Sequence, residues 1–409
     1  MGKLIVKNIG MLATPEGKTA RRGAEQGQIR ILRDAYVLLR DGLVAEVGTG
    51  EKEVFDAQVI DAGGKLVTPG LVDAHTHLVF GGWRQNELGL KLHGATYLDI
   101  LAMGGGILST VNATRAATED QLVEKARAAL DEMLSLGVTT VEAKSGYGLD
   151  LDNELKQLRA VRRLNAEHPI DLVSTFLGAH AVPKEYKEDR ESYIRLLCDE
   201  VIPAVAREGL AEFCDVFCET GVFSAAESRV ILEAGKRYGL VPKIHADEID
   251  PIGGSQLTAE MGAISAEHLI VCPPEGIAAM AEGGTVACLL PATSFYLGST
   301  FAPARAMIDA GVPVAMASDF NPGSCPSLNL QLVMNLGCLK YRMTPEEVLT
   351  AVTLNGAAAI CRADTVGSLE PGKQGDLVIW DAEDLNYICY RMGSNLVKAV
   401  VKKGHLLGA

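Results

Sequence analysis

The stretch PGLVDAHTHL, residues 69–78, decides how this 409-residue chain folds. It opens with a Pro-Gly pair, continues as a short apolar strand and ends in His75 and His77. On a strand, residues two positions apart project from the same face, so both imidazoles can reach one metal ion. Taken alone, an HxH pair is as well explained by two ordinary polar side chains, so the rest of the chain has to distinguish the two explanations.

Seven further apolar segments follow, and amphipathic helical segments separate them. They are TTVEAKSG, DLVSTFLGAH, FCDVFCE, VPKIHADE, ISAEHL, TVACLLPAT and VPVAMASD. Three of the helices carry boundary signals: one begins at Thr118 with Gln121 as capping-box partner, one spans 224–238, and one runs from Pro345 to about 359. Eight strands alternating with helices over about 300 residues predict an α/β fold, a (β/α)8 TIM-like barrel. The alternative, a doubly wound open sheet, lacks its glycine fingerprint after the first strand.

Both ends of the chain have the texture of short strands joined by turns. Asp41-Gly42 stands between two alternating runs, which is a hairpin signal. We expect residues 1–66 and 365–409 to form one small β-sandwich domain, and residues 67–364 to form the barrel.

Composition limits the partners and the compartment. The net charge of −14 and the pI of about 5.1 disfavour nucleic acid and anionic membranes as partners, because both need a basic surface. The N-terminus lacks the pattern of a secretory signal, and no apolar run of ~20 residues is present. Together with nine scattered cysteines, these features predict a cytoplasmic protein with free thiols and no membrane contact.

Polar residues gather at the carboxyl ends of the predicted strands, where a barrel of this kind builds its site. Five of the eight histidines fall there, and Asp319 follows the eighth strand. His75, His77, His245 and Asp319 together favour a metal site, since three nitrogens and one carboxylate suit zinc or iron. A metal ion there lowers the pKa of bound water toward ~7, which favours hydrolysis at neutral pH.

The motifs also carry a resemblance. The run PGLVDAHTHL, the β-like segment before it and GSLEPGKQGDLVIWD near the end resemble the amidohydrolase superfamily. The segments HTHLVFGGWR, EAKSGYGL, LGAHAVP, FCDVFCE, HADE and SDFNPGSCP are similar to its imidazolonepropionase family, which acts in histidine degradation. The resemblance covers essentially the whole chain.

What the resemblance implies is specific. One Zn2+ or Fe3+ ion per chain would be held by His75, His77, His245 and Asp319. A metal-bound hydroxide would hydrolyse the cyclic amide of 4-imidazolone-5-propanoate to N-formimidoyl-L-glutamate. The substrate contacts would be Arg84, Tyr147, His180, Glu248, Asn321, Gly323 and Ser324, with Arg84 binding the propionate. The family is usually dimeric, which implies a homodimer.

Four residues are the candidates for the chemical step. Glu248 and Asp319 are placed to carry the proton from water to the departing ring nitrogen. His180 and His268 are the candidates to polarise the carbonyl, and the sequence does not choose between them.

Other interpretations remain open at this point. Lys144 is a candidate carbamylated metal bridge, although its place on the second strand favours a structural or electrostatic role, and Glu219 is a candidate ligand for a second metal. A nucleobase deaminase uses similar ligands, but a neutral base offers no propionate for Arg84. A non-catalytic scaffold typically loses its metal ligands, and this chain keeps all of them.

Overall fold

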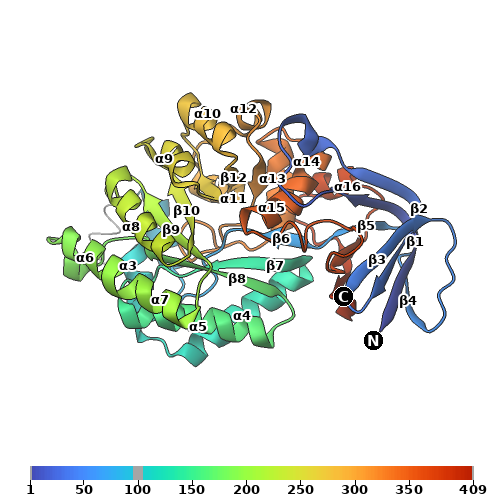
Figure 1. The fold of residues 1–409 in the computed structure, drawn as a ribbon, viewed down its shortest axis with the longest axis horizontal. Helices are drawn as coiled ribbons and strands as arrows, with labels where there is room; N and C mark the ends of the chain where they lie inside the picture. The colour runs from blue at the N-terminus through green and yellow to red at the C-terminus, as the bar shows by residue number, and fades with distance from the viewer. Residues whose placement is uncertain (1, 95–104, 408–409) are drawn as a thin grey trace.

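The computed structural model describes residues 2–94 and 105–407. A barrel of parallel strands surrounded by helices makes up the larger part, and a second sheet lies beside it (Figure 1). The barrel strands pair in chain order: β6 (Leu71–Asp73), β7 (Val138–Lys144), β8 (Asp171–Ala179), β9 (Phe213–Cys218), β10 (Val241–Ala246), β11 (Ser265–His268), β12 (Val286–Leu289) and β13 (Val314–Met316). The predicted eight-stranded barrel is confirmed.

The barrel closes just beyond the ends of its first and last strands. A parallel bridge joins Thr76 to Phe320, and the Asp319 amide donates to the His75 carbonyl at 3.0 Å. The HxH pair therefore lies past the end of β6, not within it as the sequence suggested. Because Thr76 turns its hydroxyl to the Glu142 carbonyl at 2.6 Å, the two flanking histidines still point to the other side.

Helices cover the outside of the barrel, and the described ones are α1 (Glu87–Leu92), α3 (Ile107–Ala116), α4 (Glu119–Ser135), α5 (Leu151–Glu167), α6 (Arg190–Leu196), α7 (Ile202–Glu208), α8 (Ala225–Arg237), α9 (Gly254–Met261), α10 (Pro274–Gly283), α11 (Pro291–Leu297), α12 (Ala304–Asp309), α13 (Leu330–Leu339), α14 (Pro345–Ala351), α15 (Leu354–Ala359) and α16 (Leu385–Tyr390). Thr118 caps α4 through the predicted capping box. Ser224 caps α8 in the same way, at the predicted start.

One predicted helix is wrong, because the segment from Pro345 to Ala359 forms two helices, α14 and α15. The break falls at Val352 and Thr353, two β-branched residues of low helix propensity. The Val352 carbonyl accepts from the Val72 amide at 2.9 Å. The Val352 carbonyl is therefore bonded to strand β6. In a continuous helix it would instead accept from an amide of the next helical turn.

The second sheet is built from both ends of the chain. Its strand order is β16-β15-β14-β5-β1-β2-β3, and β4 pairs with β1. The bounds are β1 (Lys3–Thr14), β2 (Arg30–Arg40), β3 (Leu43–Thr49), β4 (Ala57–Asp61), β5 (Leu66–Pro69), β14 (Leu377–Trp380), β15 (Val397–Lys402) and β16 (His405–Leu407). Asp41 and Gly42 form the predicted hairpin turn, both with positive φ, which this turn type requires.

This terminal sheet is joined to the barrel at the amino ends of the barrel strands. Asp171, the first residue of β8, accepts from Lys402 of β15 at 2.7 Å. Lys402 also pairs with Asp376 at 2.6 Å, and the Asp376 carbonyl accepts from the Gly70 amide. The joint therefore lies at the opposite end of the barrel from the polar strand ends.

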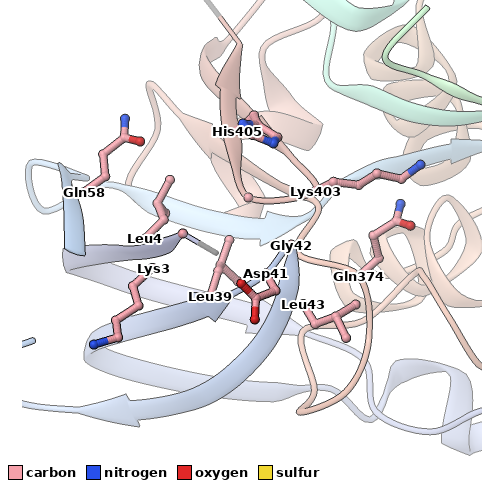
Figure 2. Close-up of a pocket in the computed structure, with 12 residues that line it drawn as sticks. Lys3, Leu4, Leu39, Asp41, Gly42, Leu43, Gln58, Gln374, Lys403 and His405 are labelled. Carbon is pink, nitrogen blue, oxygen red and sulfur yellow. The ribbon is translucent and has the colours of Figure 1, made fainter. Parts of the chain in front are cut away.

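An open pocket of about 490 Å3 lies at one end of the terminal sheet (Figure 2). Lys3, Asp41, Lys403 and His405 contribute its charged and ionisable lining, and the two lysines point away from each other. Among the described residues, no group of three adjacent metal-ligand atoms lies in this pocket. The groups of adjacent metal-ligand atoms lie in the barrel instead.

All nine cysteines are free thiols, as predicted. Within residues 2–94 and 105–407, no helix has the length and apolarity needed to cross a bilayer.

Candidate active site

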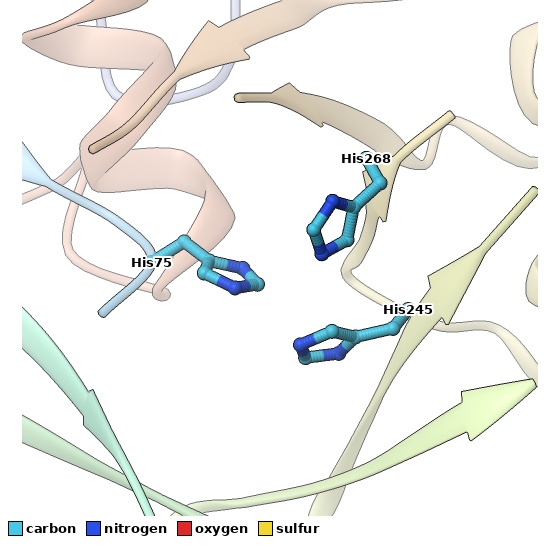
Figure 3. A group of neighbouring side chains, drawn as sticks. All are labelled: His75, His245 and His268. Atoms are coloured by element: carbon cyan, nitrogen blue, oxygen red, sulfur yellow. The ribbon is translucent and has the colours of Figure 1, made fainter. Parts of the chain in front are cut away.

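The five strand-end histidines meet at the carboxyl end of the barrel. The ring centres of His75 and His245 lie 4.7 Å apart, and those of His245 and His268 lie 5.3 Å apart. Figure 3 shows these three rings turned toward one another from three different elements. His77 stacks on His180 at 4.8 Å and lies 5.4 Å from His75. Residues scattered over nearly 200 positions thus form one cluster.

The four predicted metal ligands belong to this cluster. His75, His77 and Asp319 form one group whose ligand atoms all lie within 4.8 Å of one another, and His75, His245 and His268 form a second. His75 Nε2 is 3.4 Å and His77 Nε2 is 3.6 Å from Asp319 Oδ1. His75 is common to both groups, so the two groups are adjacent.

These residues fit a metal ion because their ligand atoms are buried without other partners. His75 Nε2, His245 Nε2 and Asp319 Oδ1 make no hydrogen bond within the described structure. Buried polar atoms are normally paired, so three unpaired ligand atoms within one cluster fit a bound cation. Asp319 Oδ2, by contrast, accepts from the Thr293 hydroxyl at 2.6 Å, which turns Oδ1 inward.

Burial also keeps most of the cluster in the protonation state that binds metals. Burial lowers the pKa of His75 and of His77 well below the usual histidine value, and neighbouring positive groups lower it further. It lowers the pKa of His180 to about 3 and that of His268 to about 4. These four imidazoles are therefore neutral at pH 7 and have a free lone pair.

His245 is held differently. Burial lowers its pKa, but the adjacent Asp215 carboxylate outweighs this effect, so the pKa is raised overall. Its Nδ1–H donates to Asp215 Oδ1 at 3.1 Å, which leaves Nε2 as the atom facing the site. A carboxylate behind a histidine ligand is the usual way in which proteins fix a metal-binding tautomer.

Glu248 is the candidate proton carrier at this site. It lies in the loop after β10, with Oε2 3.7 Å from His268 Nε2. Burial raises the pKa of Glu248 to about 7. A carboxyl group with this pKa exchanges protons readily at neutral pH, as a general base and acid must.

Tyr147 and His180 form one wall of the site. Their ring centres are 5.3 Å apart, and Tyr147 also lies 5.8 Å from His77. His180 Nδ1–H donates to the Gly146 carbonyl at 3.1 Å, which leaves Nε2 free. Gly146 has a φ of +111° and leaves no room for a side chain, because a Cβ there would lie 2.9 Å from His180 Nδ1.

Arg84 and the turn after Asp319 form another wall. A Cβ at Gly323 would lie 1.2 Å from Arg84 Nη2, so only glycine lets the guanidinium lie on this turn. Arg84 Nε is buried without a hydrogen bond, although Glu87 Oε2 is 3.8 Å away. Arg84 also lowers the pKa of Tyr147, against the larger raising effect of burial, so the two walls face a common space.

Asn321 and Ser324 hold this turn together. Asn321 Oδ1 accepts from the amides of Gly323 and Ser324, each at 2.8 Å. Its Nδ2 donates to the Asp319 carbonyl at 2.7 Å and to the Ser324 hydroxyl at 2.9 Å. The Asn321 side chain is therefore engaged in shaping the turn that follows Asp319.

The contacts of Lys144 and Glu219 argue against a second metal ion. Three carboxylates surround Lys144, and although burial lowers its pKa, these outweigh burial and raise it, so the amine stays protonated and does not react with carbon dioxide. Glu219 accepts from the amides of Thr220, Ile249 and Asp250 at 2.7, 2.9 and 3.1 Å. The Glu219 carboxylate is therefore occupied by hydrogen bonds from backbone amides.

Sequence reasoning missed Asp215 and Thr293, the partners of two proposed metal ligands. Asp215 interrupts the apolar strand FCDVFC and is fully buried, and Thr293 follows β12 in the segment PAT. The available signal was a carboxylate at a strand position that should face the barrel interior.

Comparisons with known proteins agree with this geometry. The sequence model of the amidohydrolase family matches residues 66–407. An imidazolonepropionase of Alkaliphilus metalliredigens (strain QYMF) is 53% identical over 414 residues, covering 100% of this chain and 98% of the relative. One of Brevibacillus brevis (strain 47 / JCM 6285 / NBRC 100599) is 52% identical, covering 99% and 97%.

Solved structures share the fold at low identity. Zinc-complexed atrazine chlorohydrolase from Arthrobacter aurescens TC1 superposes with a TM-score of 0.74 at 19% identity, over 99% of this chain and 95% of that one. A zinc-bound adenosine deaminase from Xanthomonas campestris gives 0.75 at 18%, over 100% and 93%. The full-length identity to curated relatives and the family match together show that this chain belongs to the amidohydrolase family, in its imidazolonepropionase branch.

Proposed function

We propose that this protein is an imidazolonepropionase, which opens the ring of 4-imidazolone-5-propanoate by hydrolysis of its cyclic amide. The hydroxyl of water adds to the carbonyl carbon, the carbon–nitrogen bond breaks, and the ring nitrogen takes a proton to give N-formimidoyl-L-glutamate. The observation that carries the proposal is Arg84 lying against Gly323 beside the histidine cluster. A guanidinium there binds a carboxylate tail, which an imidazolone propionate has and a nucleobase lacks.

The proposed metal ligands are His75, His77, His245 and Asp319, supported by the overlapping groups of adjacent ligand atoms and by the unpaired atoms of His75, His245 and Asp319. A bound zinc or iron ion would lower the pKa of a water molecule and polarise the amide carbonyl. His268 is the next residue in the cluster, but Glu248 faces its Nε2, which favours a role in hydrogen bonding.

The remaining residues orient the substrate and move the proton. Glu248, with a pKa of about 7, accepts the proton of the attacking water and returns it to the departing nitrogen. Neutral His180 donates its one N–H to the Gly146 carbonyl and presents Nε2 as an acceptor. Neutral His268 is therefore the candidate donor to the carbonyl oxygen as it gains negative charge. Tyr147 covers the ring, and the turn of Asn321, Gly323 and Ser324 lies beside Arg84.

The test combines an assay with metal analysis of the same sample. Purified protein should form N-formimidoyl-L-glutamate from freshly generated 4-imidazolone-5-propanoate and contain close to one zinc or iron per chain. Efficient deamination of guanine or cytosine, with the imidazolone left intact, would overturn the proposal. Two metal ions per chain would contradict the mononuclear site.

A further inference from the structure

A network of buried charged residues lies inside the barrel directly behind His245. It consists of Glu142 and Lys144 on β7, Asp215 on β9, Lys243 on β10 and Glu267 on β11, all with no exposed surface. Lys144 Nζ is 2.8 Å from Asp215 and 3.0 Å from Glu142, and Lys243 Nζ is 2.8 Å from Glu142. Such groups cost several kcal/mol each to bury, so their retention asks for a reason beyond stability.

Part of this network has the arrangement of ligand atoms that a cation site has. Ligand atoms of Asp215, His245 and Glu267 all lie within 4.8 Å of one another. Glu267 Oε2 is fully buried and makes no hydrogen bond, yet it lies 3.7 Å from Lys144 Nζ. The Lys144 ammonium therefore contacts both carboxylates of the group, and it supplies the positive charge that a second metal ion would otherwise bring.

The same ammonium controls the orientation of His245 through Asp215. Asp215 accepts from Lys144 with Oδ2 at 2.8 Å and from His245 Nδ1 with Oδ1 at 3.1 Å. Lys144 is the lysine that contacts Asp215, so its removal would leave the Asp215 carboxylate free to rotate. His245 would then lose the partner that keeps Nε2 directed at the site.

We propose that the Lys144 ammonium is a built-in cation of the active centre, filling a position between Asp215, Glu142 and Glu267 and fixing the carboxylate that orients His245. Lys144 is thus a positioning residue that acts through Asp215. This inference rests on the metal-ligand role of His245 in the proposed function.

The test is chemical rescue of metal affinity. Lys144→Ala removes three carbons and one nitrogen, which are the atoms of propylammonium. The zinc dissociation constant, measured by chelator competition on folded protein, should rise tenfold to a hundredfold, the range found when partners of metal ligands are removed. Propylammonium chloride added before the metal should restore most of the affinity, while propanol at the same concentration should not.

Two control variants make the result specific. Lys144→Met keeps the volume filled, so it should lose the same affinity and gain nothing from propylammonium. Lys402→Ala removes another buried lysine, in the terminal sheet, and should keep the wild-type affinity. Unchanged affinity in Lys144→Ala, or equal loss in Lys144→Ala and Lys144→Met with no response to propylammonium, would overturn the proposal.

Asp215→Asn tests the same link if Lys144→Ala does not fold. This substitution leaves two lysines facing two glutamates, so the remaining network is balanced in charge. Its zinc affinity should fall at least tenfold, and wild-type affinity would overturn the role of Asp215. If wild-type protein itself binds no zinc or iron, the proposed metal centre fails first, which separates the two hypotheses.

Discussion

At the residue scale, the site shows how one kind of side chain takes opposite roles in different surroundings. Asp215 is fully buried and Glu248 is partly exposed, and both carboxyl groups interact electrostatically with His245. Burial raises the pKa of each, but His245 and Lys144 outweigh it at Asp215, whose pKa is lowered far below the usual range. Glu248 has only the weaker influence of His245 and keeps a pKa of about 7. Asp215 is therefore a fixed charge, and Glu248 is a group that can exchange its proton.

The role of Glu248 predicts a specific pH dependence. As a base it must be ionised, so kcat/KM should fall as the pH drops below about 7, where Glu248 becomes protonated. Glu248→Gln should lower kcat on the order of a hundredfold or more and abolish this inflection. Rates measured from pH 5.5 to 8.5 on both proteins check it. The same inflection in Glu248→Gln would assign the titration to another group.

Arg84 predicts a separate effect on binding. Arg84→Met should raise KM roughly tenfold to a hundredfold, because a charge-assisted hydrogen bond contributes about 1.5–3 kcal/mol. The value of kcat should change much less, since the propionate lies away from the breaking bond. Arg163→Met, at an exposed ion pair on α5, is the matched control and should leave KM unchanged. An unchanged KM in Arg84→Met would remove Arg84 from substrate binding.

At the residue scale, the sequence predicts residues that face the site directly but not the residues that support them. His75, His77, His245 and Asp319 could be predicted to lie together because they follow apolar strands at the same end of a barrel. Asp215 was missed because its task depends on distances to His245 and Lys144 across three strands, and no spacing along the chain encodes them.

At the element scale, the proposed proton carrier Glu248 lies on the loop after β10, and hydrogen bonds anchor this loop. Glu219, directly after β9, accepts from the amides of Ile249 and Asp250, which follow Glu248. Its carboxylate thus fixes the backbone that aims the proposed proton carrier. The sequence offered Glu219 as a metal ligand because a strand-end carboxylate alone does not reveal what it faces.

This anchor predicts that Glu219→Gln affects turnover through the loop. The amide oxygen can accept from Thr220 and Asp250 as Glu219 Oε1 does, but the amide NH2 would then face the Ile249 N–H and lose that bond, so the loop should loosen. We expect kcat to fall about tenfold with little change in KM. Hydrogen exchange of residues 247–252 should become faster than in wild type. Wild-type kcat together with unchanged exchange would show that the loop needs no such support.

Helix boundaries can be predicted from the sequence where nearby residues set them, but not where distant residues do. The capping residues Thr118 and Ser224 mark helix starts correctly because the cap is a contact within four residues. The break between α14 and α15 escaped notice because the acceptor at Val352 is taken by Val72, far away in the chain. Pairing across the barrel overrides local propensity at this point.

At the scale of the whole molecule, buried ion pairs link the two sheets. Lys402 is 3% exposed and binds Asp171 of the barrel and Asp376 of the terminal segment. The C-terminal part of the terminal sheet is thereby fixed to the amino end of β8, away from the histidine cluster. The sequence predicted that the ends pair with each other, but it gave no sign of which barrel strand they contact.

The joint predicts a loss of stability without a loss of metal binding. Lys402→Met leaves Asp376 buried without its cation and should lower the free energy of unfolding by about 3 kcal/mol, at the low end for a broken buried pair. Lys398→Met, an exposed change on the same strand, should stay within about 0.5 kcal/mol. Urea unfolding of the metal-loaded proteins measures both effects.

The pH dependence of that loss follows from Asp171. Burial would raise its pKa, but Lys402 and Lys403 outweigh burial and lower it. A lowered carboxyl pKa contributes stability that is present above the unfolded value, about 3.9, and is lost as the pH falls through the folded value. Wild type should therefore lose its advantage over Lys402→Met as the solution is acidified below pH 4. A difference that stays constant from pH 7 to pH 3 would mean that packing of the lysine stem, and not its charge, holds the two sheets together.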